Sequence, residues 1–295
     1  MKRCAILTMD CLDDFEVYDQ LLDQPLAKLG WQTELVSWHK QDVNWDQFDV
    51  VLIRTPWDYQ DDAAKFMHVL AAIENSSAVL ENSINIVDWN INKKYLRELQ
   101  QHGVCIVPTL WQEQYDAQLI ADYFNQLDSE QIVIKPCVSA NADNTFWLTR
   151  DSWAQYSQAL AKAFASRDFM VQPFMQSVVD EGEFSCFYFD GHYSHSILKT
   201  PKQGDFRVQE EHGGQLRLVT AEARLKQQAD HAMQQLAKVD NMPMYARVDF
   251  VRMGDEFAMM EAELIEPSLY FNMDENAAPL FARLFAERMQ RLYNL

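Results

Sequence analysis

Short apolar runs alternate with segments of helical periodicity in the first third of the chain. Strands are predicted at residues 4–8, 33–37, 49–53 and 78–80, and amphipathic helices at residues 12–29 and 61–75. Pro25 is expected to kink or break the first helix, because proline lacks the amide hydrogen that a helix interior needs. This β-α-β alternation predicts a parallel sheet covered by helices.

Two polar residues directly follow predicted strands, namely Asp10 and Arg54. Ligands of open parallel sheets bind beyond the carboxyl ends of the strands, so both are candidate site residues. Arg54 opens the segment RTPWDY (54–59), and its guanidinium is suited to clamp a substrate carboxylate through two hydrogen bonds. The alternative is that Arg54 pairs with a neighbouring aspartate while Trp57 covers the edge of the unit.

Three further lysines lie in local environments where an anion would stabilise their charge. A helix predicted over residues 92–103 places Lys93 and Lys94 in its first turn, where a positive charge opposes the helix dipole unless an anion binds there. Lys135 closes the apolar strand 131–135 and also needs an anionic partner. Both features favour a phosphate-binding site.

The remaining middle segment predicts mixed structure, with helices at 116–127 and 152–165 and strands at 145–148 and 169–172. The loop 139–144 is small and polar, which suits either a flap over phosphates or a plain surface turn. Pro173 is expected to end the hydrogen bonding of the strand before it.

A hairpin is predicted next, with strands 184–189 and 192–198 joined by an Asp-Gly turn, and Glu183 enters it from its first strand. His192 and His195 are three residues apart in a strand, so they point to opposite faces and make a poor metal pair.

Lys199, Lys202 and Arg207 then form a basic loop in a mainly acidic chain, which predicts an anion site. His212 is a solvated residue or a base. Helices are predicted at 222–239 and 279–293, and the apolar stripe of the last one indicates core packing.

The stretch 245–271 predicts a hairpin that carries three carboxylates. Glu261 and Glu263 share one face of its second strand, together with Phe257, Met259 and Ile265. An odd-numbered loop around Gly254 would place Asp249 opposite Glu261, whereas an even-numbered loop would break the cluster. Facing carboxylates repel unless a cation lies between them, and all-oxygen ligands indicate Mg²⁺ or Mn²⁺. The alternative is an acidic face without function.

Composition narrows the class of protein. The chain has 295 residues with 48% hydrophobic content, enough for two or three packed units, and its net charge of −19 argues against nucleic acid or an anionic membrane as a partner. Five scattered cysteines without CxxC spacing indicate neither disulfides nor zinc, which fits a reducing cytoplasm. The eight glycines form neither a Walker loop nor a dinucleotide fingerprint.

The order of these residues resembles the ATP-grasp ligases, and in particular prokaryotic glutathione synthetase and its relatives. The resemblance rests on INKKYL, VIKP, VQPFM, GEFS, RVDF and MEAEL, with Glu263 in place of a common asparagine. The segments RTPWDY, KTPKQGDFRVQEEHGG and LIEPSLYF are nearer still to the subgroup that contains the cyclo-ligase of cycloserine biosynthesis.

This resemblance implies an α/β fold with an α+β lid. It divides the chain into a Rossmann-like domain (1–88), an ATP-grasp lid (89–172) and a carboxyl-terminal ATP-grasp subdomain (173–295). ATP would bind between the last two, releasing ADP and phosphate through an acyl phosphate that an amine attacks. Small-molecule carboxylates and amines are the implied partners, in a cytoplasmic enzyme that binds no nucleic acid or membrane. Self-association into a homo-oligomer stays open.

The resemblance also implies roles for single residues. The nucleotide would contact Lys93 and Lys135 through its phosphates, Glu183 through its ribose, and the backbone of Gln172, Pro173 and Phe174 through its adenine. The metal ligands would be Asp249, Glu261 and Glu263. Arg207 and Lys199 would stabilise the transferring phosphoryl group, and Arg54 and Ser268 would contact the substrate. Ligation, cyclisation within one molecule, and a catalytically silent nucleotide-binding module remain alternatives.

Overall fold

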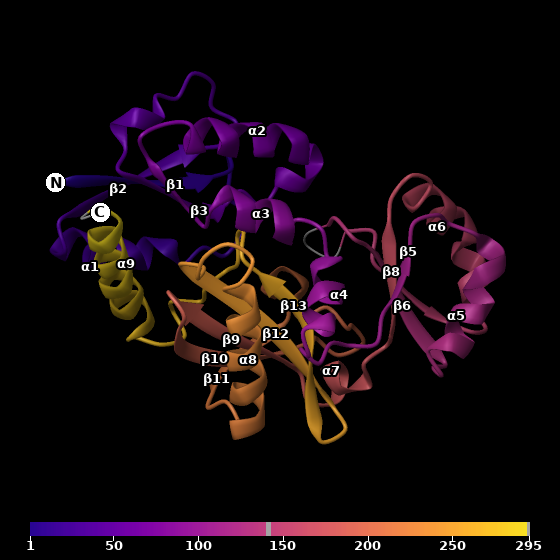
Figure 1. Cartoon of the computed structure of the whole chain (residues 1–295). Coiled ribbons are helices and arrows are strands. Elements are labelled where there is room, and N and C mark those ends of the chain that lie inside the picture. Colours follow the sequence, from indigo (N-terminus) through magenta and orange to yellow (C-terminus); the bar gives the residue numbers. More distant parts are fainter. Residues whose placement is uncertain (140–142, 294–295) are drawn as a thin grey trace.

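The first of three sheets lies at the amino-terminal end of the chain, in a computed structural model that describes residues 1–139 and 143–293 (Figure 1). Its strands are β1 (Lys2–Thr8), β2 (Trp31–Ser37), β3 (Val50–Thr55) and β4 (Val79–Glu81). They are parallel and lie in the order β2-β1-β3-β4, so the predicted parallel sheet is confirmed. The apolar runs of β1 and β3 are buried because helices cover both faces.

One face of this sheet packs against α1 (Asp23–Lys28) and α9 (Ala277–Tyr293), and the other against α2 (Ala63–Glu74). The helix predicted over residues 12–29 is wrong in its first half, since helical structure begins only at residue 19. Pro25 lies in the first turn of α1, where its missing amide hydrogen is tolerated. Short 3-10 helices lie at Asp19–Leu22, Trp45–Gln47 and Tyr59–Asp62.

The second sheet is antiparallel and stands apart from the others at the right of Figure 1. It has the order β5-β8-β6-β7, formed by β5 (Leu110–Gln112), β8 (Phe169–Pro173), β6 (Gln131–Pro136) and β7 (Phe146–Thr149). It packs against α5 (Ile120–Gln126) and α6 (Ser157–Ala163), each preceded by a 3-10 turn (Ala117–Leu119 and Trp153–Tyr156). Residues 140–142 of the predicted phosphate flap lie outside the described residues.

The third sheet is also antiparallel, in the order β11-β10-β9-β12-β13. Its strands are β9 (Glu183–Phe189), β10 (His192–Thr200), β11 (Gln215–Val219), β12 (Tyr245–Met253) and β13 (Glu256–Glu263). One face packs against α4 (Tyr95–Gln101) and α8 (Ala223–Leu236), with α7 (Gln176–Asp180) before β9 and a 3-10 turn at Glu210–His212. The predicted hairpin of β9 and β10 is confirmed.

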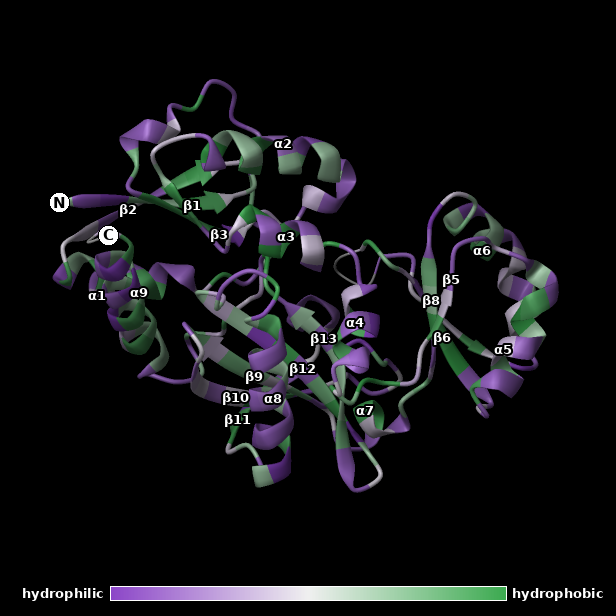
Figure 2. Ribbon diagram, in the orientation of Figure 1, coloured by the Kyte–Doolittle hydropathy of each residue, from purple (hydrophilic) through white to green (hydrophobic). Residues whose placement is uncertain are grey.

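Two helices pack across the expected domain boundaries. α4 joins the core of the third sheet, and α9 joins the core of the first sheet, although each comes from another of the three predicted ranges. The division into 1–88, 89–172 and 173–295 stays a prediction. Figure 2 shows how hydrophobic residues follow the strands of the sheets, whereas loops and outer helical turns are more hydrophilic.

The predicted lysine helix begins later than expected. α3 (Ile84–Asn90) ends first, and α4 starts only at Tyr95, so Lys93 and Lys94 precede it instead of lying in its first turn. The Asn92 side chain accepts a hydrogen bond from the amide of Lys94, as a cap would. The lysines are therefore presented by a link between two helices.

The carboxylate hairpin reaches the expected register by an unexpected route. Asp249 does lie opposite Glu261, but the loop is the even-numbered turn Gly254–Asp255 between the paired residues Met253 and Glu256. Gly254 has a φ of 63°, which suits the first central position of a type II′ turn. A β-bulge between Asp249 and Phe250 then restores the pairing.

The bulge also corrects the predicted face of the second strand. Phe257 and Met259 lie with Ala262 in the core under α8, on the face opposite Glu261 and Glu263. The extra residue at the bulge is Met260, which lines the cavity described below. Because a bulge changes the alternation of the strand, a strict period of two fails here.

Candidate active site

A cavity of about 230 Å³ opens where the three sheets meet. The first unit contributes Tyr59, the second sheet contributes Lys135, and the third contributes Asp249 and Glu261. Twelve of the predicted site residues line this cavity, whereas Arg54, Asp10 and Lys202 do not; the twelve are Lys93, Lys135, Gln172, Pro173, Phe174, Glu183, Lys199, Arg207, Asp249, Glu261, Glu263 and Ser268. Segments far apart in the sequence are thus brought together as the predicted order requires.

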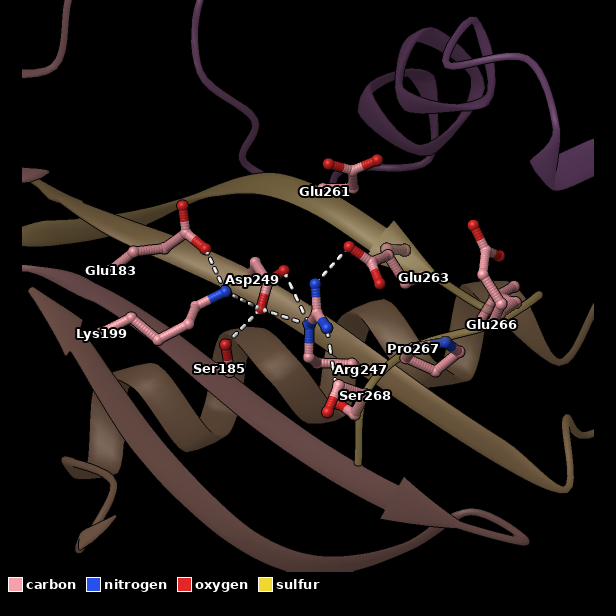
Figure 3. Close-up of polar contacts among 12 residues, drawn as sticks. Glu183, Ser185, Lys199, Arg247, Asp249, Glu261, Glu263, Glu266, Pro267 and Ser268 are labelled. Carbon is pink, nitrogen blue, oxygen red and sulfur yellow. Dashed lines mark hydrogen bonds and ion pairs between the residues drawn. The ribbon is translucent and has the colours of Figure 1, made fainter. Parts of the chain in front are cut away.

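Two of the three hairpin carboxylates contact an arginine, whereas Glu261 points away from it (Figure 3). Arg247 precedes Asp249 by two residues on β12, so the two share a face. Its Nε donates to the carboxylate of Asp249 at 3.0 and 3.2 Å, and its Nη2 donates to Glu263. One guanidinium therefore neutralises part of the charge of both strands.

A second cation approaches Asp249 from β10. Lys199 Nζ lies 2.5 Å from Glu183 Oε1 and 3.5 Å from Asp249 Oδ1, and Ser185 Oγ donates to Asp249 at 2.5 Å. The start of β9 must pass close to β10 for this contact. A Cβ at Gly182 would lie 2.7 Å from the carbonyl oxygen of Lys199, and the φ of 124° there also requires glycine.

The acidic groups of the cavity differ in how well they are neutralised. Burial alone would raise the pKa of Asp249, but Arg247, Lys199 and the hydrogen bond from Ser185 together outweigh burial, and the pKa lies below its usual range. For Glu263 burial prevails over the same arginine, and the pKa rises to about 7. Burial and the charge of Glu263 raise the pKa of Glu266 to about 8. The cavity thus favours an additional cation.

Lys93 and Lys135 both face Glu261. Lys93 Nζ lies 3.0 Å from Glu261 Oε1 and donates to the carbonyl oxygen of Ser139 at 2.7 Å. Burial opposes its charge, but Glu261 together with Glu263 and Glu266 outweighs burial and raises the pKa of Lys93. Burial lowers the pKa of Lys135, and Glu261 offsets this only in part. An anion placed between the two lysines would stabilise both charges. Lys94 instead pairs with Asp168, at 2.5 Å.

The strand end at residues 172–174 borders the cavity beside an aromatic cluster. Phe174 stacks on Trp147 of β7 with ring centroids 4.4 Å apart, and Phe206 meets both rings edge-on. The Gln172 side chain donates to Thr109 at 3.0 Å. The backbone amide of Phe174 donates to the carbonyl oxygen of Gln131 at 2.8 Å, so it is already engaged. An apolar, planar ligand group would find a wall here.

The predicted basic loop is divided between two environments. Lys199 is buried in the carboxylate cluster, whereas Arg207 lies at the border of the cavity and pairs with Asp205 through two hydrogen bonds of 3.1 and 2.8 Å. Lys202 is exposed and does not line the cavity. Two of the three predicted cations therefore meet the cavity.

Arg54 is fully buried and lies outside the cavity lining. Its guanidinium pairs with Asp19 at 3.0 and 3.1 Å, and Nη2 donates to the carbonyl oxygen of Pro267 at 2.8 Å. The arrangement matches the alternative in which Arg54 pairs with an aspartate. Asp10, the other residue at a strand end, is exposed and accepts a hydrogen bond from Ser37.

Sequence reasoning missed three residues of the site, namely Arg247, Glu266 and Tyr59. The spacing of two between Arg247 and Asp249 was a usable signal, because alternate strand residues share a face. Tyr59 and Glu266 come from segments that were singled out, but their contact joins the first sheet to the loop after β13. No local pattern predicts such a contact.

The donor set of Asp249, Glu261 and Glu263 fits Mg²⁺ in its chemistry, since all three offer carboxylate oxygens. Among the described residues no group of three acidic, histidine or cysteine side chains is arranged to hold a metal ion. Arg247 bonds two of the three carboxylates and Lys93 pairs with the third. Binding of the ion would therefore require Glu263 to exchange its arginine partner.

The sequence of this chain is similar to that of known proteins. A family model described as the amino-terminal domain of the D-cycloserine synthetase DcsG matches residues 4–82. The cycloserine biosynthesis protein DcsG of Streptomyces lavendulae is 27% identical over 278 residues, which cover 89% of this chain and 90% of that protein.

Two solved structures have a fold similar to that of this chain. The crystal structure of D-cycloserine synthetase DcsG has a TM-score of 0.87 at 26% identity, covering 97% of this chain and 99% of that one. D-alanine–D-alanine ligase from Bacillus anthracis has a TM-score of 0.72 at 14% identity, covering 99% and 98%. The chain has the ATP-grasp fold, and the predicted resemblance to ATP-grasp ligases is confirmed.

Proposed function

We propose that this protein is an ATP- and Mg²⁺-dependent ligase that joins a carboxylate to an amine of a small, amino-acid-like substrate. The observation that carries the proposal is the meeting of Lys93, Lys135 and Glu261 in one cavity with Glu183 and Asp249. Two lysines with a shared acidic partner suit the phosphates of a nucleotide, and the acidic groups suit its ribose and its metal.

In this proposal ATP lies between the second and third sheets. Its phosphates would replace Glu261 as partners of Lys93 and Lys135, and its adenine would bind beside Phe174 and Phe206. Mg²⁺ held by the carboxylates of the hairpin would neutralise charge on the phosphate oxygens. Release of the lysines by Glu261 would leave that carboxylate free to serve as a ligand.

The remaining basic residues would act on the phosphoryl group that is transferred. Arg247 lies at the centre of the carboxylate cluster and Lys199 within it, while Arg207 lies at the border of the cavity, so all three would act to stabilise negative charge on the transferring phosphoryl group. The γ-phosphoryl passes from ATP to the substrate carboxylate, which gives an acyl phosphate and ADP. An amine then attacks the acyl carbon, and phosphate leaves. No protein nucleophile is required.

Cyclisation within one molecule is a second candidate. The similarity to the cycloserine biosynthesis protein over 89% of this chain favours cyclisation, whereas the more distant likeness to D-alanine–D-alanine ligase favours ligation. In that case the carboxylate and the attacking nitrogen belong to the same substrate, and the product is a ring.

ADP release in the presence of ATP and Mg²⁺ tests the proposal, with amino-acid carboxylates offered alone and together with amine acceptors. We expect release to depend on one carboxylate compound, and product mass to separate the two reactions. Loss of water from a single substrate without an acceptor indicates cyclisation, whereas joining of two compounds indicates ligation. Nucleotide binding without ADP release for any compound would support the catalytically silent module instead.

A further inference from the structure

The loop after β13, residues 265–268, is held by donors from distant parts of the chain. The Tyr245 hydroxyl lies 3.1 Å from the carbonyl oxygen of Ile265, and Trp57 Nε1 donates to that of Glu266 at 2.8 Å. Arg54 Nη2 donates to the carbonyl oxygen of Pro267 at 2.8 Å. The carbonyl groups of Glu266 and Pro267 are therefore fixed, and that of Ile265 lies beside the Tyr245 hydroxyl, which restricts the backbone that carries the side chain of Glu266.

The Glu266 carboxylate borders the cavity apart from the network of Arg247 (Figure 3). Within residues 1–139 and 143–293 no ion pair to Glu266 is formed. Among the acidic side chains, Glu263 raises the pKa of Glu266 most. Burial and the charge of Glu263 disfavour its ionised form, and the charge of Lys93 and a hydrogen bond from Tyr59 compensate for this only in part. A partly buried carboxylate without a cation in direct contact is an incomplete pair that a ligand can complete.

The surroundings of Glu266 favour a cation as that ligand. Trp57 and Tyr59, which contact Glu266, line the cavity together with Phe15. The rings of Phe15 and Trp57 lie 5.1 Å apart. Aromatic faces attract ammonium groups. The aromatic side chains and the Glu266 carboxylate therefore both favour a cationic ligand group.

We propose that Glu266 binds the ammonium group of the amino-acid substrate, and that Arg54 and Trp57 are positioning residues that hold it through the carbonyl groups of its loop. The inference rests on the proposed ligase function, and it selects substrates with a free, protonated amine beside the reacting carboxylate. It also gives the RTPWDY segment a role in substrate recognition that does not require Arg54 to touch the substrate.

Matched ligand pairs test this role in the full-length protein with ADP and Mg²⁺ present. We would measure dissociation constants by calorimetry for D-alanine against D-lactate, D-serine against D-glycerate, and D-cycloserine against its N-acetyl derivative. The wild type is expected to prefer the amine of at least one pair. Glu266→Gln should weaken binding of that amine about ten- to a hundredfold and leave its amine-free partner unchanged, because a charged hydrogen bond is lost.

Two variants and one measurement keep the outcomes distinct. Glu266→Asp should recover part of the preference, and Glu275→Gln, at an exposed glutamate outside the cavity, should change nothing. ADP affinity measured in parallel shows whether Glu266→Gln is folded. A wild type that binds no amine of the three, or a Glu266→Gln protein that keeps the preference, would overturn the proposal. Failure of the ligase function would appear separately, as intact amine preference without ADP release from ATP.

Discussion

Arg247 is the residue on which the charge balance of the cavity depends. It contacts Asp249 and Glu263 at once, and together with Lys199 it keeps Asp249 ionised. Glu266, three residues beyond Glu263, has no such partner in the described part of the chain. The site therefore contains both a carboxylate neutralised by direct ion pairs and, among the described residues, a carboxylate with no ion pair, which the charge of Lys93 compensates only in part.

Glu261→Gln tests the assignment of the hairpin to metal and phosphate binding. The amide keeps the size of the side chain but removes its charge, so ADP release is expected to fall at least about a hundredfold while the protein stays folded. Circular dichroism checks folding, and a coupled assay measures ADP. Glu256→Gln on the same strand is the matched control, because Glu256 pairs with Arg224 near the surface. Wild-type activity in the Glu261→Gln protein would refute the metal assignment.

Glu266→Gln should change the pH dependence of stability. The folded protein raises the pKa of Glu266 to about 8, so ionisation of this group costs stability progressively from the unfolded pKa near 4 up to about 8. The glutamine variant escapes this cost. Its melting temperature, measured without nucleotide or Mg²⁺, is expected to exceed that of the wild type on the order of a few degrees at pH 9 and to match it near pH 4. A difference of the opposite sign at pH 9 would show that Glu266 has a cationic partner.

Elements were predicted best where periodicity and burial agree. Strands β1, β3, β9 and β10 follow their apolar runs closely. Twelve residues that were predicted from the order of lysines and carboxylates along the chain line one cavity. The bulge in the β12–β13 hairpin was not predictable, since the sequence around Met260 shows nothing that distinguishes an extra residue from a regular one. Contacts between distant segments, such as Trp57 with the carbonyl group of Glu266, have no local signal either.

An aromatic contact joins the second sheet to the loop after β10. Phe206→Ala removes the edge-on packing on Trp147 and Phe174, which holds the loop against the second sheet. The KM for ATP is expected to rise about five- to tenfold, because an aromatic contact of this kind contributes about 1 kcal/mol. Tyr156→Ala removes a comparable contact, with Phe146 of the second sheet, at a residue that does not line the cavity, and serves as control. Equal KM values in the Phe206→Ala and wild-type proteins would show that the loop needs no such anchor.

At the scale of the whole molecule, the carboxyl-terminal helix joins the first and third sheets. α9 packs its apolar stripe against α1 and the first sheet, as well as against residues of β9 and β12. Within residues 1–139 and 143–293 no helix has the length and hydropathy of a membrane span. Because the cavity lies between these units, the packing of α9 contributes to the geometry of the site although α9 itself does not line it.

A buried ion network on α9 carries part of this connection. Arg288 contacts Glu81 at the end of β4, with a shortest N–O distance of 2.5 Å, and Asp190 at the turn between β9 and β10, at 2.8 Å. Burial raises the pKa of Glu81 even with this arginine present, so loss of the arginine leaves a buried charge without compensation. Arg288→Ala is therefore expected to lower the free energy of unfolding by about 3–5 kcal/mol, measured by urea denaturation. Arg283→Ala on the exposed side of the same helix removes only a surface pair with Glu287 and should cost less than about 1 kcal/mol. Equal losses in the two variants would show that the helix is held by its apolar stripe alone, and that the two sheets are not joined through charge.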